Sequence, residues 1–158
     1  MNIEYIIQAI AWIVVTLLLF FLVPKEKIRE AQVIFFFKQV MSWLLGYIVV
    51  ELNLIKYPIR FFPNAGMTSF TFEYYIYPGI SVLFNLYYPQ GQTLLKKLIY
   101  YSLYCSGITI LEVLLELYTN TIVYVHWTWY LTWITLFLTF FASREYYKWF
   151  FGIKSPKR

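Results

Sequence analysis

The chain's fold is decided near its start by an uncharged apolar run, IIQAIAWIVVTLLLFFLV at residues 6–23. A helix needs roughly 20 apolar residues to cross the hydrocarbon layer of a bilayer, and this run is close to that length. Apolar residues occupy every face of the predicted helix, so the solvent around it must be lipid. No basic residue precedes the run and no small-residue cleavage pattern follows it, so we expect a retained helix rather than a signal peptide.

The composition of the whole chain agrees with that first run. Of its 158 residues 61% are hydrophobic and 13% are charged, with no Asp, whereas soluble domains carry charge at about a quarter of their positions. The formal net charge is +5, but the basic residues flank apolar runs, so we expect the lipid bilayer and not nucleic acid as the partner. A single cysteine, Cys105, excludes an intramolecular disulfide, and no cofactor is predicted.

The sequence therefore predicts an all-α, polytopic transmembrane helical bundle that forms one domain over residues 1–158. Five transmembrane helices are expected, at about residues 6–23, 33–50, 70–88, 98–118 and 121–141.

The connections between these runs have distinct characters. Residues 51–69 contain Pro, Asn and Gly among aromatic residues and are predicted to lie along the membrane interface. Pro78-Gly79 should kink the third helix. Little more than Thr119-Asn120 joins the fourth and fifth helices, which should be antiparallel neighbours. Residues 144–158 form a basic aromatic C-terminal tail, expected on an anionic inner leaflet.

The distribution of Lys and Arg predicts the orientation in the cell membrane. One side of the bundle carries most of them, and the other side carries two, Lys56 and Arg60. The rich side has Lys25, Lys27, Arg29, Lys96, Lys97, Arg144, Lys148, Lys154, Lys157 and Arg158. Because the basic side of short loops stays in the cytoplasm, we expect a multi-pass protein with the N-terminus outside and the C-terminus cytoplasmic.

Polar residues at helical spacing predict a polar interior that is widest toward the outside. Three of the predicted helices carry such a stripe, and polar faces in hydrocarbon should point at one another. The stripes are Glu73, Tyr77, Ser81 and Asn85; Cys105, Thr109, Glu112 and Glu116; and Thr128, Thr132, Thr135 and Thr139.

An ionisable residue inside a membrane span is a functional hypothesis by default. The candidate polar cluster is Glu73, Glu112, Glu116, His126 and Arg60, with Lys38, Glu51, Tyr77, Asn85 and Thr109 as lesser candidates. A structural alternative is open for each: threonines glue helices, Lys38 snorkels to the inner interface, and the acidic group is a hydrogen-bonded network. The spacing matches no known metal site.

Several motifs carry a resemblance to a known family. They are Tyr57–Arg60, Thr68–Tyr74 with Tyr77-Pro78, Asn85–Pro89, Thr109–Val113, His126–Trp133 and Arg144–Phe151. With these motifs the chain resembles, over nearly its whole length, the small polytopic membrane proteins of spore-forming bacilli and clostridia that are described as conserved hypothetical proteins. The resemblance implies a source and a fold but no reaction, and it includes Arg60, Glu73, Glu112, Glu116 and His126 in matching motifs.

Three functions are compatible with these features. The first is binding or passage of a cation, proton or small polar solute at the buried Glu/His cluster, alone or as a homo-oligomer. The second is an accessory or structural subunit that packs against partner membrane proteins. The third, less favoured, is a membrane enzyme acting on a lipid or isoprenoid, which no nucleophile motif or phosphate loop supports.

The predicted orientation can be tested with reporter fusions. The reporter is one that is active only in the cytoplasm. Fused to the C-terminus it should be active, because the basic residues keep that side of the protein in the cytoplasm. A C-terminal fusion that is active only on the outer side of the membrane would contradict the orientation.

Overall fold

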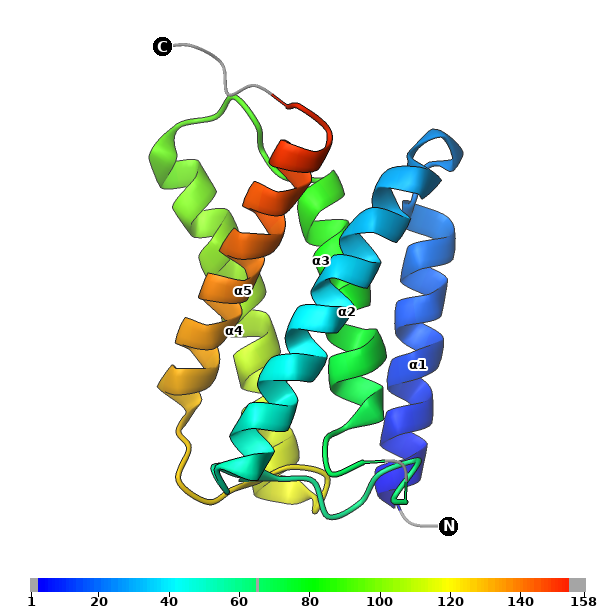
Figure 1. The fold of residues 1–158 in the computed structure, drawn as a ribbon, viewed down its shortest axis with the longest axis vertical. Helices are drawn as coiled ribbons and strands as arrows, with labels where there is room; N and C mark the ends of the chain where they lie inside the picture. The colour runs from blue at the N-terminus through cyan, green and yellow to red at the C-terminus, as the bar shows by residue number, and fades with distance from the viewer. Residues whose placement is uncertain (1–2, 65, 154–158) are drawn as a thin grey trace.

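The computed structural model describes residues 3–64 and 66–153. Within them five α-helices run along the long axis of the molecule, as Figure 1 shows, so the predicted all-α class is confirmed. Their bounds are α1 (Ile3–Leu22), α2 (Ile28–Glu51), α3 (Tyr77–Leu86), α4 (Leu94–Tyr118) and α5 (Trp129–Phe150). The shorter elements are the 3-10 turn η1 (Lys25–Lys27), the π-helix η2 (Phe70–Ile76) and the two-residue strands β1 (Ile55–Lys56) and β2 (Val123–Tyr124).

Three segments of the described chain are long and apolar enough to cross a membrane. They are Ile3–Leu22, Lys25–Glu51 and Leu94–Tyr118, with 20, 27 and 25 residues. Large apolar side chains on them point outward, and Phe20 and Phe21 of α1 are 77% and 74% exposed. Such a surface suits lipid rather than water, and it suggests a multi-pass membrane protein.

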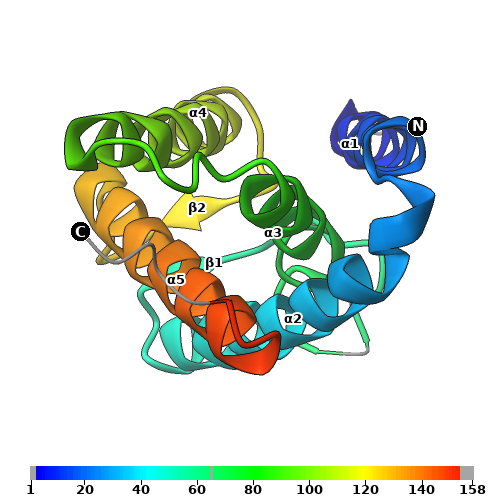
Figure 2. The same ribbon diagram turned by 90° about the horizontal axis from the view of Figure 1, so that it is seen from above.

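The helix α3 lies at the centre of the bundle. Figure 2 shows it surrounded by the other helices when the molecule is viewed along its long axis. It packs against α1, α2 and α5, while α4 packs against α5 as the predicted antiparallel neighbour. The connection between α4 and α5 is longer than predicted, since it covers residues 119–128 and includes β2.

The strands β1 and β2 pair at one end of the bundle, which we call the sheet end. They are antiparallel, with Ile55 opposite Tyr124 and Lys56 opposite Val123. The prediction of a helix starting at residue 121 was wrong, because α5 begins at Trp129. Residues 121–125, TIVYV, are mostly β-branched, and such residues favour an extended chain that can pair with a neighbouring strand.

The helices α1, α2 and α4 start earlier than predicted, and α5 ends later. Residues 28 and 94 begin α2 and α4, since the charged residues of their first turns are good helix formers. The predicted surface tail from residue 144 was also wrong in part, because α5 continues to Phe150 with Arg144 and Tyr147 buried inside the bundle. The rest of that tail, residues 154–158, lies outside the described residues.

The predicted kink at Pro78 takes the form of a change in helix type. The π-helix η2 passes directly into α3, and Pro78 stands in the first turn of α3, where its missing N–H is tolerated. The Tyr77 N–H bonds to the carbonyl of Phe72, five residues back. Pro78 has no N–H to continue this pattern, so it leaves the Glu73 carbonyl without a π-type donor and the Tyr74 carbonyl without an α-type donor.

Side chains of α2 bond to both of these carbonyls. The Gln39 amide donates to the Tyr74 carbonyl oxygen at 2.9 Å, and the Ser42 hydroxyl lies in hydrogen-bond contact with the Glu73 carbonyl oxygen. Both side chains are buried. Since an unpaired carbonyl is costly in an apolar interior, these bonds fix η2 against α2 and so set the position of Glu73.

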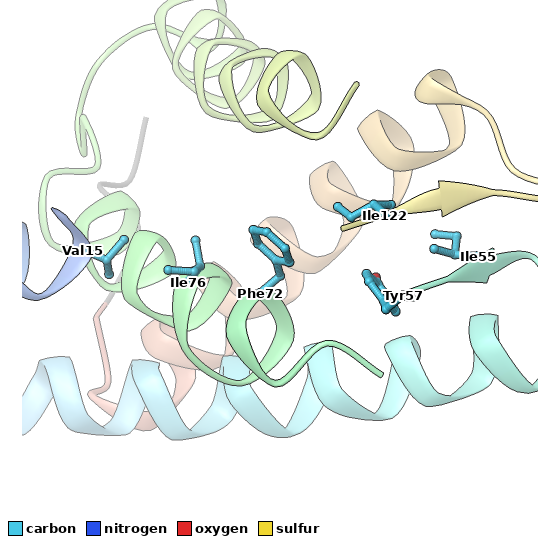
Figure 3. Close-up of a cluster of buried hydrophobic side chains, with 6 residues drawn as sticks. All are labelled: Val15, Ile55, Tyr57, Phe72, Ile76 and Ile122. Atoms are coloured by element: carbon cyan, nitrogen blue, oxygen red, sulfur yellow. The ribbon is translucent and has the colours of Figure 1, made fainter. Parts of the chain in front are cut away.

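Apolar packing near the sheet end joins segments that are distant in sequence. Figure 3 shows Val15 of α1, Phe72 and Ile76 of η2, and Ile122 with Ile55 and Tyr57 of the two loop segments. All six side chains are buried. This cluster holds the loops that carry β1 and β2 over the end of the bundle.

The bond between Gln39 and the Tyr74 carbonyl can be tested by a double-mutant cycle. Gln39→Leu should lower the free energy of unfolding by about 1–3 kcal/mol, because it leaves a buried carbonyl unpaired. In a Pro78→Ala background the loss should be smaller, since the restored N–H can serve a freed carbonyl. Chemical denaturation in detergent micelles measures both values. Gln32→Leu, an exposed change on the same helix, is the control, and equal losses with and without Pro78→Ala would contradict this role.

Candidate functional site

The carboxyl group of Glu112 is the most heavily bonded acidic group in the described chain. It is buried on α4 and accepts hydrogen bonds from three hydroxyl groups. The Tyr77 hydroxyl donates to Oε2 at 2.8 Å, and those of Tyr124 and Thr132 donate to Oε1 at 2.8 and 3.0 Å. Donors from α3, β2 and α5 therefore meet at one side chain of α4, and a carboxylate with several donors is well stabilised without a counter-ion.

The connection between α4 and α5 keeps the Thr132 and Tyr124 hydroxyls available as donors to Glu112. The Trp127 indole N–H donates to the Thr132 hydroxyl at 2.8 Å, which leaves the hydroxyl proton of Thr132 free to bond Glu112. Burial, and then the negative charge of Glu112, raises the pKa of the Tyr124 hydroxyl, so this group stays protonated and remains a donor.

Glu73 is buried on η2, and one of its oxygens is unpaired. Its side chain is 3% exposed, and its Oε2 atom has no hydrogen-bond partner in the described structure. The carboxyl group lies directly against Gly46 of α2, where any side chain would overlap it. The absence of a side chain at Gly46 thus creates the space that Glu73 occupies.

Lys38 of α2 is buried on the same side of the helix as Ser42 and Gly46. Its side chain is 1% exposed, which contradicts the expectation that it snorkels to the membrane surface. Its Nζ atom donates to the Thr139 hydroxyl and lies 4.7 Å from the centre of the Phe140 ring, a cation–π contact. In the part of the chain described here, no carboxylate is close enough to form a salt bridge with it.

The two carboxyl groups and the Lys38 ammonium line one cavity of about 120 Å³. The helix α2 forms one wall and α5 another, while the loops at the sheet end contribute Ile55, Tyr57 and Trp127. The polar lining residues are Lys38, Ser42, Tyr57, Glu73, Tyr77, Glu112, Thr132, Thr135 and Thr139. The cavity thus contains one basic and two acidic side chains inside an otherwise apolar bundle.

Tyr57 closes the cavity from the loop that carries β1. Its side chain is buried and belongs to the apolar cluster of Figure 3. Burial, followed by the negative charges of Glu73 and Glu112, raises the pKa of the Tyr57 hydroxyl well above its usual value. Its hydroxyl therefore remains a neutral hydrogen-bonding group at physiological pH.

The structure separates other members of the predicted cluster from this cavity. His126 was expected in the first turns of the fifth helix beside Glu112, but it precedes α5 and its side chain is exposed. The Arg60 guanidinium donates to the carbonyls of Met67 and Pro63 in its own loop, at 2.8 and 3.2 Å. Glu116 is half-buried on α4 and does not line the cavity, and Glu51 is exposed at the end of α2.

Ser81 and Asn85, the last two residues of the predicted stripe on the third helix, belong to a second polar cluster. This cluster lies toward the end of the bundle opposite the sheet end. Asn85 donates to the Ser143 hydroxyl at 3.0 Å, and Ser81 bonds the same hydroxyl at 3.0 Å. Arg144 donates to the Asn85 carbonyl at 3.1 Å and to the Gln90 side chain at 2.6 Å, and lies 4.1 Å from the Tyr88 ring centre. The one charged side chain named here, Arg144, is held by neutral partners, which is typical of a structural network.

Helical spacing in the sequence predicted some of the residues that line the cavity and missed others. The stripes identified Glu73, Tyr77, Glu112 and three threonines, and the four-residue spacing of Lys38, Ser42 and Gly46 was a signal that could have placed Lys38 inside. Tyr57, Tyr124 and Trp127 reach the site from the connections between helices. Because these segments have no helical period, their sequence does not indicate which side chains point inward. Thr109 is buried on α4 outside the cavity, and its hydroxyl is unpaired.

Among residues 3–64 and 66–153, no group of three or more His, Cys, Asp or Glu side chains is arranged to hold a metal ion. Comparisons with family models, with curated proteins and with solved structures find no match to this chain.

The close contact between Gly46 and Glu73 predicts an unusual effect of a glycine substitution. Gly→Ala inside a helix commonly stabilises by about 0.5–1 kcal/mol. Gly46→Ala should instead lose this gain and destabilise by up to about 1 kcal/mol, because its methyl group forces the buried Glu73 carboxyl to shift. The control is Gly107→Ala on α4, where the added methyl group meets open space and the usual gain is expected.

Thermal unfolding in detergent micelles measures both variants. If Glu73 is the cause, Gly46→Ala becomes stabilising in a Glu73→Ala background. A destabilisation that persists unchanged without the Glu73 side chain would refute this explanation.

Proposed function

We propose that this chain is a five-helix membrane protein of the cell membrane that binds a cation or proton, or a small polar solute, in the cavity between Glu73, Glu112 and Lys38. Three segments long and apolar enough to span a membrane support the membrane assignment. In this proposal α3, with η2, and α5 also span, because they run beside these segments through the same bundle (Figure 1). The N-terminus is then outside and the C-terminus is cytoplasmic, as the basic residues predict.

The unpaired carboxyl oxygen of Glu73 carries the functional proposal. Two carboxyl groups and one ammonium group line the cavity, so the site has one more acidic than basic group. A buried charge without compensation is strongly unfavourable, and a bound cation or a proton would remove the imbalance. Glu112 has three hydroxyl donors, whereas Glu73 Oε2 has none, which makes Glu73 the position where the added positive charge is most needed.

The lining atoms also fit this class of ligand. Carboxylate, hydroxyl and phenol oxygens are the ligands that hard cations prefer. A cavity of about 120 Å³ has room for a small ion with a few water molecules but not for a large substrate. The Lys38 ammonium already occupies one side of the cavity. In this proposal it acts as a resident positive charge that weakens the binding of the transported or bound cation.

An accessory role is the second candidate, supported by a separate observation. Large apolar side chains cover the outside of several helices, among them Leu103, Leu117 and Trp149 at 67%, 64% and 75% exposure. Such surfaces can pack against partner membrane proteins or a second copy as well as against lipid. The relation to the small membrane proteins of spore-forming bacilli and clostridia remains a proposal, as does the less favoured role as a membrane enzyme.

Purified protein in proteoliposomes tests the cation proposal. Uptake of radioactive sodium and the fluorescence of an enclosed pH dye report cation and proton movement. Glu73→Gln and Glu112→Gln should each reduce flux or cation affinity by about tenfold or more, since each removes a charged ligand worth about 1.5–3 kcal/mol. Lys38→Met should have the opposite effect on affinity, because it removes the competing positive charge.

Glu116→Gln is the matched control. It makes the same change on the same helix as Glu112→Gln but outside the cavity, and should leave flux and affinity unchanged. If Glu73→Gln keeps full flux and affinity while the protein remains folded, the cavity does not bind the ion. The accessory role would then gain support, and product formation from a supplied lipid would favour an enzyme.

A further inference from the structure

The ionisable groups that line the polar cavity limit the charge of what can bind there. Its lining contains two carboxyl groups, Glu73 and Glu112, and one ammonium group, Lys38. All three side chains are buried, with exposed fractions of 3%, 7% and 1%. With all three groups charged the cavity lacks one positive charge, and such an imbalance is costly in an apolar interior.

The other ionisable groups around these three side chains do not change this charge balance. Phenols and thiols are uncharged at neutral pH. Those that face the three side chains are Tyr57 of the β1 loop, Tyr77 of α3, Tyr124 of β2 and Cys105 of α4. Charged side chains of neighbouring helices lie outside the lining, among them Glu4 of α1, Glu116 of α4 and Arg144 of α5. The cavity therefore accommodates one added unit of positive charge.

Neutral groups hold the Lys38 ammonium. Its Nζ atom donates to the Thr139 hydroxyl, whose own proton is donated to the Leu136 carbonyl at 3.1 Å. The Phe140 ring is a further partner, through the cation–π contact. Within residues 3–64 and 66–153 no carboxylate forms a salt bridge with it. No direct partner offsets the charge of Lys38, so this charge acts on any ion that enters the cavity.

The distance from Lys38 to Glu73 determines how strongly an ion at Glu73 is repelled. The Glu73 carboxyl lies against Gly46, which is about 12 Å from Lys38 along α2. At this separation, and with an effective dielectric constant of about 20, repulsion between two unit charges lowers affinity by about tenfold. Because the repulsion is proportional to the charge of the ion, a divalent cation loses about a hundredfold.

Glu73 is the acid whose surroundings favour an added positive charge. Three hydroxyl groups donate to Glu112 and stabilise its charged form. The Oε2 atom of Glu73 has no donor in the described structure, although it is buried. A proton or a cation at this oxygen supplies the missing charge, but both together would exceed it.

We propose that Glu73 holds either one proton or one monovalent cation and exchanges one for the other, and that Lys38 disfavours divalent cations at this site. This inference rests on the proposed function and adds the valence of the ion and the proton that it displaces. When the cation binds, the proton leaves the Glu73 carboxyl group for water, and the carboxylate becomes a ligand of the cation. Lys38 is then a residue that determines specificity across the cavity.

Isothermal titration calorimetry of the purified protein in detergent micelles tests the exchange. Sodium chloride is titrated at neutral pH in two buffers with different ionisation enthalpies, and the difference in heat gives the number of protons released. We expect about one proton for each sodium ion bound, because the two compete for one charge. Glu73→Gln should release no proton, since it removes the group that carries it.

Lys38→Met tests the effect on valence. The ratio of calcium affinity to sodium affinity should rise by about tenfold, because the repulsion removed is twice as large for calcium. Lys38→Gln is a second neutral variant, to be used if Lys38→Met does not fold. Lys38→Arg keeps the charge and should keep the ratio. The matched control is Lys96→Met, which removes the same charge from an exposed position on α4.

The possible results separate this inference from the proposed function. Sodium binding without proton release would overturn the exchange and leave the cation site in place. Proton release that disappears in Lys38→Met would assign the proton to Lys38 and would overturn its assignment to Glu73. An unchanged affinity ratio in folded Lys38→Met or Lys38→Gln would overturn the role of Lys38. If neither ion binds at all, the proposed function itself fails, and this inference fails with it.

Discussion

The hydrogen bonds that converge on Glu112 are the constraint on which the rest of the structure depends. Glu112 belongs to α4, and its donors Tyr77, Tyr124 and Thr132 come from α3, the β2 loop and α5. In an apolar bundle a buried carboxyl without such donors is costly. Satisfying one side chain therefore fixes the relative positions of three helices and a loop.

Pro78 supplies the second constraint, which acts through the backbone. Its missing N–H frees carbonyls in η2, and α2 binds them with Gln39 and Ser42. This docking brings η2 so close to α2 that the Glu73 carboxyl lies on Gly46. A backbone irregularity, a small residue and a buried acid thus depend on one another, as is common where helices carry function.

An apolar groove between α1 and α4 meets the polar cavity at a single hydrogen bond. Tyr77 and Glu112 line both spaces, so the bond between them separates polar from apolar surroundings.

Much of the architecture follows from the sequence alone. The apolar runs predicted a helical bundle. Polar spacing along the third, fourth and fifth helices identified Glu73, Tyr77, Glu112 and the threonines, because periodicity reveals which residues share a face. Only the tertiary structure decided that Lys38 and Arg144 are buried and that His126 is exposed. It also decided that Tyr57, Tyr124 and Trp127 reach the site from loops. A loop has no period, and a long basic side chain can turn either inward or outward, so contacts between distant segments determine where such groups lie.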